Sequence, residues 1–203
     1  MAVMRGMLAA YSGVASGSPP TVVSFQYNPT EVTRVLRLQK DDSASGGGSA
    51  LNTRDTAIEE YTLTLELDAT DGLEKGAPLT TALGIAPRLA ALELLMEPVG
   101  TSTLGDLLSS GSRPATLKLP LVLLIWGPGR IAPVVLTSLK ISETGFDELL
   151  NPIHASADLG FQVLGSRDVS ADDAVAQAAI GYYQGARAAK AVLQAPQVVE
   201  LGS

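Results

Sequence analysis

The segment from Pro114 to Gly165 constrains the fold most strongly, because it contains three strand-like runs separated by turn residues. The first run, Leu117 to Trp126, becomes continuously apolar, which is typical of a strand buried on both faces. Gly127-Pro128-Gly129 follows directly, and two glycines with a proline end a helix and permit a chain reversal. The sequence therefore predicts a β-hairpin at this point rather than a buried helix.

Two further runs follow the hairpin turn, and both alternate apolar with polar side chains. The run from Pro133 to Glu143 places Val135, Thr137, Leu139 and Ile141 on one face. The run from Ile153 to Leu164 has Ala157, Leu159, Phe161 and Val163 in phase. We expect three adjacent antiparallel strands that form the core of a sheet.

The rest of the chain up to residue 165 reads mainly as strands with one inserted helix. The predicted strands cover residues 5–11, 21–27, 31–39 and 58–67, and the predicted helix covers Ala86 to Met96. The strand at 58–67 is the most clearly amphipathic, with Tyr61, Leu63, Leu65 and Leu67 on one face. This order favours a mainly β fold with minor α, arranged as a small barrel or as two packed sheets.

Two stretches lack a strand pattern. Residues 40–52 are polar and rich in glycine, which fits either an idle surface loop or a segment that orders against a neighbouring subunit. Residues 98–114 are irregular, with one short helical turn expected around Leu104 to Leu108.

Strand alternation stops after Gly165, and an alanine-rich helical pattern begins. We therefore divide the chain into a β domain at residues 1–165 and a C-terminal helical extension at residues 166–203. Ser170 with Asp173 predicts a capping box at the start of this helix. Its expected apolar stripe consists of Val175, Ala178, Ala179, Tyr182, Ala186, Ala189 and Leu193.

Composition excludes several classes of function. Charged residues make up 17% of the chain and the net charge is −7, so nucleic acid is not an expected partner. Such a low charged fraction, with a positive mean hydropathy, indicates that other chains cover part of the surface. No cysteine is present, which excludes disulfides and thiolate metal sites and is compatible with a reducing compartment.

No membrane span is expected, because the longest strongly apolar run, Leu119 to Trp126, is far shorter than the ~20 residues a spanning helix needs. The first residues imitate a signal peptide in part, with Arg5 before an apolar patch. Tyr11 and Ser12 interrupt that patch, so a first strand at residues 5–11 is the preferred interpretation.

The sequence offers little for catalysis. His154 is the single histidine and has neither a second ligand nor a base near it in the sequence, so we assign it a packing or surface role. The carboxylate pairs Asp41-Asp42 and Glu59-Glu60, and Asp68 with Asp71, are expected to be solvated. Aromatic residues make up 4%, too few for a base-stacking platform or an aromatic ligand pocket. We expect no catalytic residues, no cofactor and no metal, and hence no enzyme.

Four segments, taken in order, resemble the tube-type proteins of contractile injection systems, the phage-tail-like particles that bacteria assemble. They are the FQYNPTE run from Phe25 to Glu31, the LTLELD strand from Leu63, the apolar strand ending in Trp126-Gly127, and Phe146 followed by LNPIHA from Leu150. The resemblance covers residues 5 to 165. The residues that carry it as a family signature are Phe25, Tyr27, Asn28, Pro29, Trp126, Gly127, Phe146, Asn151, Pro152 and Ala155.

The resemblance implies a phage tail-tube-like β-barrel in a non-enzymatic subunit of a hexameric ring. The ring would join the inner tube to the central spike in the baseplate. The implied partners are sibling copies, inner-tube subunits, the central spike protein and baseplate wedge proteins. Assembly would occur in the cytoplasm, with release of the finished particle as a second setting. An inner-tube subunit of the same particle and a small-ligand-binding β-barrel carrier are the alternatives.

Adaptor members of this family often continue into a peptidoglycan-binding LysM module, whereas residues 166–203 predict a single helix. Direct peptidoglycan binding is therefore not expected. The helix either docks on a tube, spike or wedge neighbour, or folds back on its own barrel.

Overall fold

The computed structural model describes residues 4–11, 20–38, 57–98 and 119–194. Of the two stretches without a strand pattern, 40–52 and 98–114, only Pro98 lies inside these ranges, so the helical turn expected around Leu104 to Leu108 falls outside them. The elements are β1 (Met7–Tyr11), β2 (Thr21–Ser24), β3 (Val32–Arg37), β4 (Ile58–Asp68), α1 (Thr70–Glu74), α2 (Pro78–Leu83), α3 (Ala86–Glu93) with a 3-10 turn (Leu94–Met96), β5 (Leu121–Ile125), β6 (Ile131–Phe146), β7 (Pro152–Val163) and α5 (Ala174–Gln194). The fold is mainly β with minor α, as the sequence predicts.

The seven strands of the described ranges belong to one antiparallel sheet with the order β2-β1-β5-β6-β7-β4-β3. The predicted hairpin after Trp126 is present, because β5 pairs with β6 through a tight turn in which Gly127 has a φ of 77°. In the described residues β2 and β3 are the two ends of this order. The sequence analysis predicted a barrel, but within the described ranges no pairing between β2 and β3 closes the sheet.

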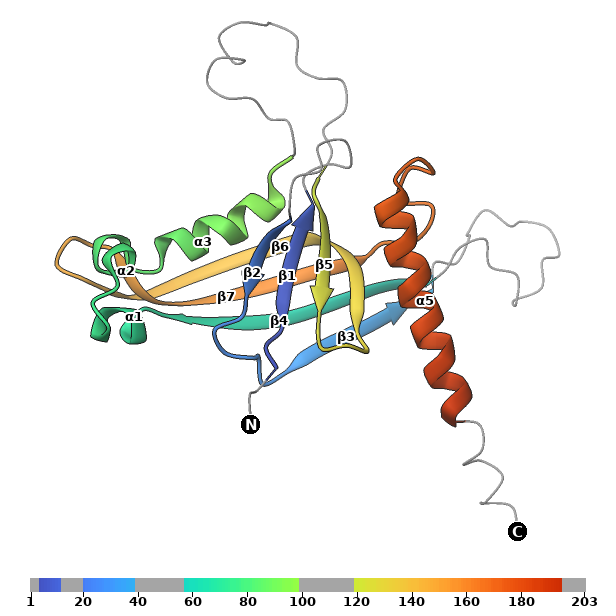
Figure 1. Ribbon diagram of the computed structural model, residues 1–203, viewed down its shortest axis with the longest axis horizontal. Helices are drawn as coiled ribbons and strands as arrows, with labels where there is room; N and C mark the ends of the chain where they lie inside the picture. The colour runs from blue at the N-terminus through green and yellow to red at the C-terminus, as the bar shows by residue number, and fades with distance from the viewer. Residues whose placement is uncertain (1–3, 12–19, 39–56, 99–118, 195–203) are drawn as a thin grey trace, which may run out of the picture.

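The sheet folds over on itself into two layers (Figure 1). We call β2, β1, β5 and the start of β6 the short layer, and the rest of β6 with β7, β4 and β3 the long layer. β6 belongs to both, since Ile131 to Val134 pair with β5 and Val134 to Phe146 pair with β7. The core lies between the layers and includes Leu8, Phe25, Tyr61, Leu124 and Phe161, all almost fully buried.

The long layer follows the predicted phase in β4 and β7. Tyr61, Leu63, Leu65 and Leu67 are buried, as are Ala157, Leu159 and Phe161, and the two sets lie opposite each other in register. In β6 the predicted core face is wrong for the first half of the strand, where Val135 and Thr137 do not face the core. A bulge between Leu136 and Ser138 shifts the register, so that Val134 and Leu136 face the core before it and Leu139 and Ile141 after it.

Of the helical segments between β4 and β5, α1 and α2 lie at the far end of the long layer, and α3 runs from there towards β2 (Figure 1). The predicted helix is confirmed as α3 with its 3-10 turn, and it buries Leu89, Leu92 and Leu95. The sequence analysis missed α1 and α2, which are too short to show a helical period. Ile85 N–H donates to the Pro152 carbonyl oxygen at 2.8 Å, which fixes the α2–α3 junction against the start of β7.

The first part of helix α5 packs against the sheet, and its C-terminal part extends beyond the strands (Figure 1). The residues buried by α5 are Ala176, Ile180 and Tyr183, so the predicted apolar stripe lies on the wrong face, with Val175, Tyr182 and Leu193 exposed. The helix start was also misplaced. Asp173, not Ser170, provides the N-cap contact, since its Oδ1 accepts the Ala176 N–H at 3.0 Å.

Candidate functional site

The structure brings the signature residues together at two separate places. Phe25, Asn28, Trp126 and Gly127 gather at the rim of the short layer, with Tyr27 and Pro29 adjacent to them in the chain. Phe146, Asn151, Pro152 and Ala155 belong to the β6–β7 hairpin at the far end of the long layer. These places have different chemistry, and neither contains a nucleophile paired with a base.

At the rim, Asn28 ties the segment before β3 to the start of the chain. Its Oδ1 accepts the Gly6 N–H at 2.8 Å, and its Nδ2 donates to the Met4 carbonyl oxygen at 2.9 Å. Both polar groups of the amide are therefore used to hold backbone. This geometry explains why an asparagine before Pro29 is suited to this position, and it assigns Asn28 a structural role.

We call the two hydrogen bonds of Asn28 to Gly6 and Met4 the clasp. Phe25 and Trp126 pack beside it, with ring centroids 6.1 Å apart and planes tilted by 52°. Gly6 has no room for a side chain, because a Cβ there would lie 2.7 Å from the Phe25 ring and 3.0 Å from Trp126. The Trp126 N–H donates to the Arg130 carbonyl oxygen at 2.8 Å and closes the β5–β6 turn. The aromatic pair thus joins β1, β2 and β5 at one end.

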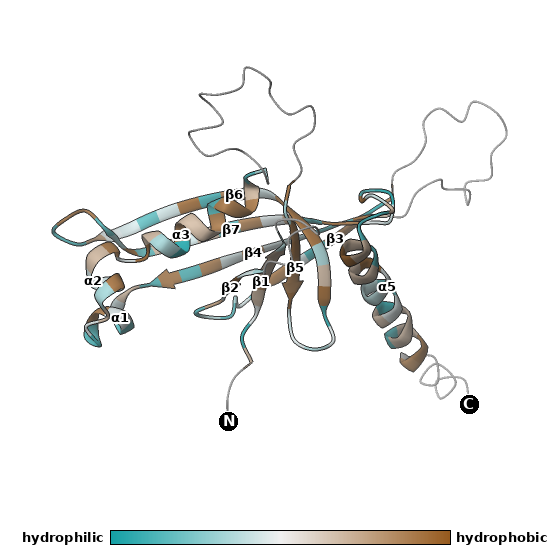
Figure 2. Ribbon diagram, turned by 45° about the horizontal axis from the view of Figure 1, so that its top comes forward, coloured by the Kyte–Doolittle hydropathy of each residue, from teal (hydrophilic) through white to brown (hydrophobic). Residues whose placement is uncertain are grey.

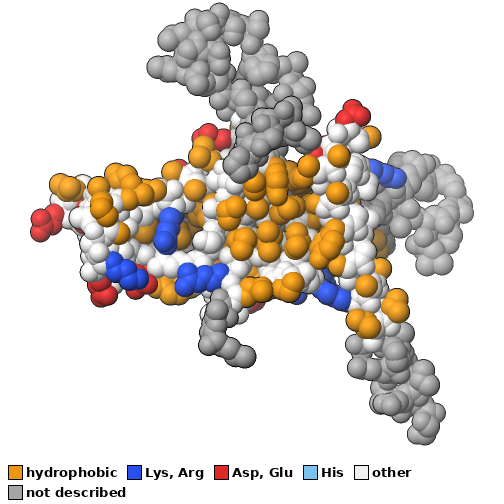
Figure 3. All heavy atoms as spheres, viewed as in Figure 1, with side chains coloured by type: hydrophobic (Ala, Val, Ile, Leu, Met, Phe, Trp, Pro, Cys, Tyr) orange, Lys and Arg blue, Asp and Glu red, His pale blue; other side chains and the backbone are white. Residues whose placement is uncertain are grey.

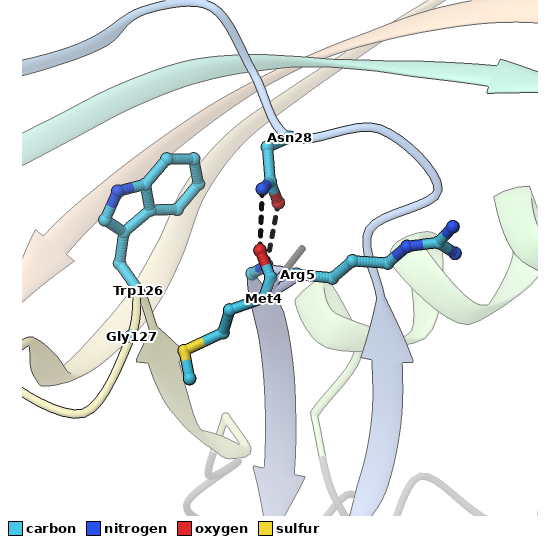
Figure 4. Close-up of a pocket in the computed structure, with 6 residues that line it drawn as sticks. Met4, Arg5, Asn28, Trp126 and Gly127 are labelled. Atoms are coloured by element: carbon cyan, nitrogen blue, oxygen red, sulfur yellow. Dashed lines mark hydrogen bonds between the residues drawn. The ribbon is translucent and has the colours of Figure 1, made fainter. Parts of the chain in front are cut away.

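A shallow cavity of about 180 Å³ opens beside the clasp (Figure 4). Its lining consists of Met4, Arg5, Gly6, Asn28, Trp126 and Gly127. In Figure 4 the Arg5 side chain extends away from Trp126, so the charged and aromatic groups do not converge on one point. Since no acid, base or nucleophile faces this cavity, its geometry fits a packing contact better than a reaction.

At the far end, Asp147 organises the β6–β7 turn. Its Oδ1 accepts the N–H groups of Leu149 and Asn151, each at 2.8 Å, and its Oδ2 accepts the Asn151 side-chain amide at 2.8 Å. The hydrogen bond from Asn151 lowers the pKa of Asp147 below its usual value. The turn holds Leu150 at a φ of 64°, a left-handed conformation that a leucine rarely adopts.

The other signature residues of the hairpin have separate roles. Ala155 is buried in the core, Pro152 accepts the Ile85 N–H through its carbonyl oxygen, and Phe146 is half exposed. The sequence analysis missed Asp147, Leu149 and Leu150. An aspartate at the start of a turn, whose side chain can accept the backbone N–H two residues on, is the Asx-turn signal that could have identified Asp147.

A buried charged cluster joins α5 to the long layer. Glu59 is only 4% exposed and accepts the Tyr183 hydroxyl at 2.6 Å and the Arg187 guanidinium at 3.1 Å, while Arg34 lies 3.6 Å away. The expectation that Glu59 is solvated is therefore wrong. Its position in phase with Tyr61 was the signal for burial. Burial and the hydrogen bond to Glu59 raise the pKa of Tyr183, and the hydrogen bond with Tyr61 raises the pKa of Arg34.

His154 lies at the surface near the start of β7. Its Nδ1 is 3.4 Å from Asp68 Oδ2, and its side chain is partly exposed. The pKa of Asp68 is lowered mainly by its hydrogen bond to Thr70, with His154 a smaller contributor. This pair has no third group in line with it among the described residues, so it does not form a catalytic triad.

The two layers present unlike outer faces. The outward side chains of β1 and β5 are apolar, so the expectation that the first run is buried on both faces holds for one face only, since Leu121, Leu123 and Ile125 are partly exposed. The outward side chains of the long layer are mostly polar, including Thr62, Thr64, Glu66, Ser156 and Asp158, with Val35 of β3 an exception. In Figure 2 β1 and β5 are almost uniformly hydrophobic, whereas β4, β6 and β7 show bands of both kinds.

Neither a protein-family model nor a curated protein matches this chain. In the four described ranges, no helix combines the length and hydropathy needed to cross a membrane.

Proposed function

We propose that this chain is a non-enzymatic, ring-forming structural subunit of a contractile injection system, joining the inner tube to the central spike in the baseplate. The observation that carries the proposal is an open antiparallel sheet with one apolar and one polar outer face. A sheet of this kind is incomplete alone and becomes complete in a closed ring of copies. The ring is hexameric, as the resemblance to tube-type proteins implies.

The sheet edges support ring formation. β2 and β3 stand at opposite ends of the strand order, and in the described ranges neither pairs with a further strand. Unpaired strand edges tend to add a strand from another chain. If β2 of one copy lies beside β3 of the next, a continuous sheet runs around the ring.

The outer faces support an assignment of inside and outside. The polar outer face of the long layer suits a water-filled lumen, and the apolar outer face of the short layer suits a contact between chains. The low charged fraction of the whole chain fits the same arrangement. Inner-tube subunits, the central spike and the baseplate wedges are the proposed neighbours of this ring.

The alternatives receive less support. A small-ligand carrier needs a hollow interior, but large side chains such as Tyr61, Phe25 and Phe161 fill the space between the layers. An inner-tube subunit would use the same sheet without a further helix, whereas here α5 is packed onto the sheet through Tyr183 and the Glu59 cluster. The adaptor position is therefore preferred to the tube position.

Light scattering coupled to size-exclusion chromatography, followed by negative-stain imaging, tests the proposal. We expect discrete rings. Long tubes would favour the inner-tube subunit, and a monomer that binds an apolar dye would favour the carrier. A monomer without a ligand at any concentration would overturn both the ring and the carrier.

A further inference from the structure

The outer face of the short layer carries mostly apolar side chains, and we call it the apolar face. Ladder partners connect its members, since Ala9 lies opposite both Val22 and Leu123, and Leu123 lies opposite Pro133. The members are Met7, Ala9, Tyr11, Val22, Leu121, Leu123, Ile125, Ile131, Pro133 and Val135. Val22 is exposed, Ala9 and Pro133 are buried among their neighbours, and the other members are partly exposed. Figure 3 shows hydrophobic side chains gathered over β2, β1 and β5.

A water-exposed antiparallel sheet normally carries polar side chains on its outer face. Here no outward position of β1 or β5 is charged, and Val22 is 53% exposed. A contiguous apolar surface of this kind marks a contact with another molecule. We therefore expect an apolar surface, from the same chain or from another, to cover the apolar face.

The end of the long layer is a second apolar surface, which we call the arm end. Leu149 and Leu150 at the hairpin tip are 80% and 78% exposed, and the other exposed apolar members are Phe146, Leu79 and Leu83. The contact of Ile85 with Pro152 holds α2 close to this hairpin. Asp147 keeps Leu150 in its left-handed conformation, so the tip presents both leucines from a fixed turn.

The charges around the two surfaces are complementary. Residues 4–11, 20–30 and 119–136, which surround the apolar face, contain Arg5 and Arg130 and no acidic residue. Residues 69–85 and 143–153, which form the arm end, contain five carboxylates and one lysine. Two apolar faces placed against each other would bring only arginines together, whereas the arm end brings carboxylates to them.

The contact has to form between chains, because the arm end projects away from the short layer of its own chain (Figure 1). We propose that the apolar face binds the arm end of a second copy of this chain, with Leu149 and Leu150 against the sheet and carboxylates beside Arg5 and Arg130. The contact is head-to-tail, so it repeats from copy to copy and closes a ring where the rotation permits. This contact rests on the proposed function, because it specifies which surfaces of neighbouring ring subunits meet.

The absence of cysteine from the chain permits a direct test by disulfide cross-linking. Two purified full-length variants are prepared, Leu149→Cys at the arm end and Val22→Cys on the apolar face, one with a mass tag. Both sites are exposed, so neither change disturbs the core. We expect a covalent heterodimer when the two are mixed under oxidising conditions, and little dimer from either alone. The double variant in one chain should give a ladder that ends at the ring size.

The matched control uses Thr64→Cys in place of Val22→Cys. Thr64 lies on the polar outer face of the long layer, so this variant should not cross-link to Leu149→Cys. Rings by light scattering without the heterodimer would overturn this contact and leave the proposed function standing. A monomer without cross-links would overturn both. Efficient homodimers of Val22→Cys alone would overturn the arm end as the occupant, as would equal cross-linking in the Thr64→Cys control.

A charge exchange provides a second measurement of the same contact. Arg5→Glu with Arg130→Glu should reduce the cross-linking rate about tenfold at low salt, since steering charges act mainly on association. Glu148→Arg in the partner variant should restore much of that loss. An unchanged rate in the arginine variants would contradict the charge pairing.

Discussion

The two outer faces of this sheet differ although the same strand, β6, runs through both layers. Where β6 pairs with β5 its outward side chains are apolar, and beyond Val135, where it pairs with β7, they are polar. Folding alone requires only that one face of each layer be buried. The inner side chains therefore follow from folding, whereas folding does not account for the difference between the outer faces.

The largest effect expected from this comparison separates two neighbours on β5. Leu124 faces the core and is almost fully buried, whereas Leu123 lies on the apolar face. Leu124→Ala should lower the free energy of unfolding by about 2–5 kcal/mol. Leu123→Ala should cost much less, because part of its surface is already exposed. Urea denaturation at one protein concentration measures both, and equal losses would show that the outer face is itself core.

The next effect concerns the charged residue buried on the inner side, Glu59. Glu59→Ala should destabilise the protein by about 1–3 kcal/mol, because Tyr183 and the arginines lose their common acceptor. Glu59→Gln keeps an acceptor for Tyr183 and should cost less. Denaturation with far-UV circular dichroism checks the order. If Glu59→Ala proves as stable as the natural chain, the cluster does not anchor α5.

The layers were predictable from the sequence to different degrees. In β4 and β7 the alternation identified the buried set, because a polar outer face leaves one phase apolar. In β5 both phases are apolar, so the sequence alone could not say which side is core. The bulge after Leu136 changes the phase of β6 without a distinctive residue.

The candidate surfaces were predictable only in part. The signature runs identified Asn28, Trp126 and Pro152 as a set, but their division between the rim and the arm end depends on pairing between distant strands. The prediction of the buried face of α5 failed for a similar reason. Alanine is frequent on every side of that helix, so the position of Tyr183 against Tyr61, 122 residues apart in sequence, decided which side is buried.

A smaller effect is expected at the arm end. Leu150→Gly removes the cost of the left-handed conformation and should stabilise the monomer by up to about 1 kcal/mol. The same change should weaken cross-linking between Leu149→Cys and Val22→Cys, because an exposed apolar side chain is lost. Thermal denaturation and cross-linking yield are measured together. A less stable monomer would show that Leu150 is retained for folding rather than for contact.

The pH dependence of the hairpin tip is smaller still. The pKa of Asp147 is lower in the folded protein than its usual value of 3.8, so its stabilising contribution is complete above that value. The contribution is lost as the pH falls through the lower folded pKa. We expect the Leu149 and Asn151 amides to stay protected from hydrogen exchange at every pH above 3.8. They should lose this protection as the pH falls through the lower folded pKa of Asp147. Asp147→Ala should abolish this protection at neutral pH, as measured by amide hydrogen exchange.

The smallest effect on folding comes from exchanging polarity between the two outer faces. Val22→Thr and Thr64→Val both alter exposed positions, so each should change the free energy of unfolding by no more than about 0.5 kcal/mol. Thr64 does lose a hydrogen bond of 2.7 Å to Asp158, but both groups are in contact with water. Assembly should respond differently. If the proposed contact between copies forms, Val22→Thr should shift light-scattering profiles towards monomer. Thr64→Val should leave them unchanged, because of the two outer faces only the apolar face takes part in that contact.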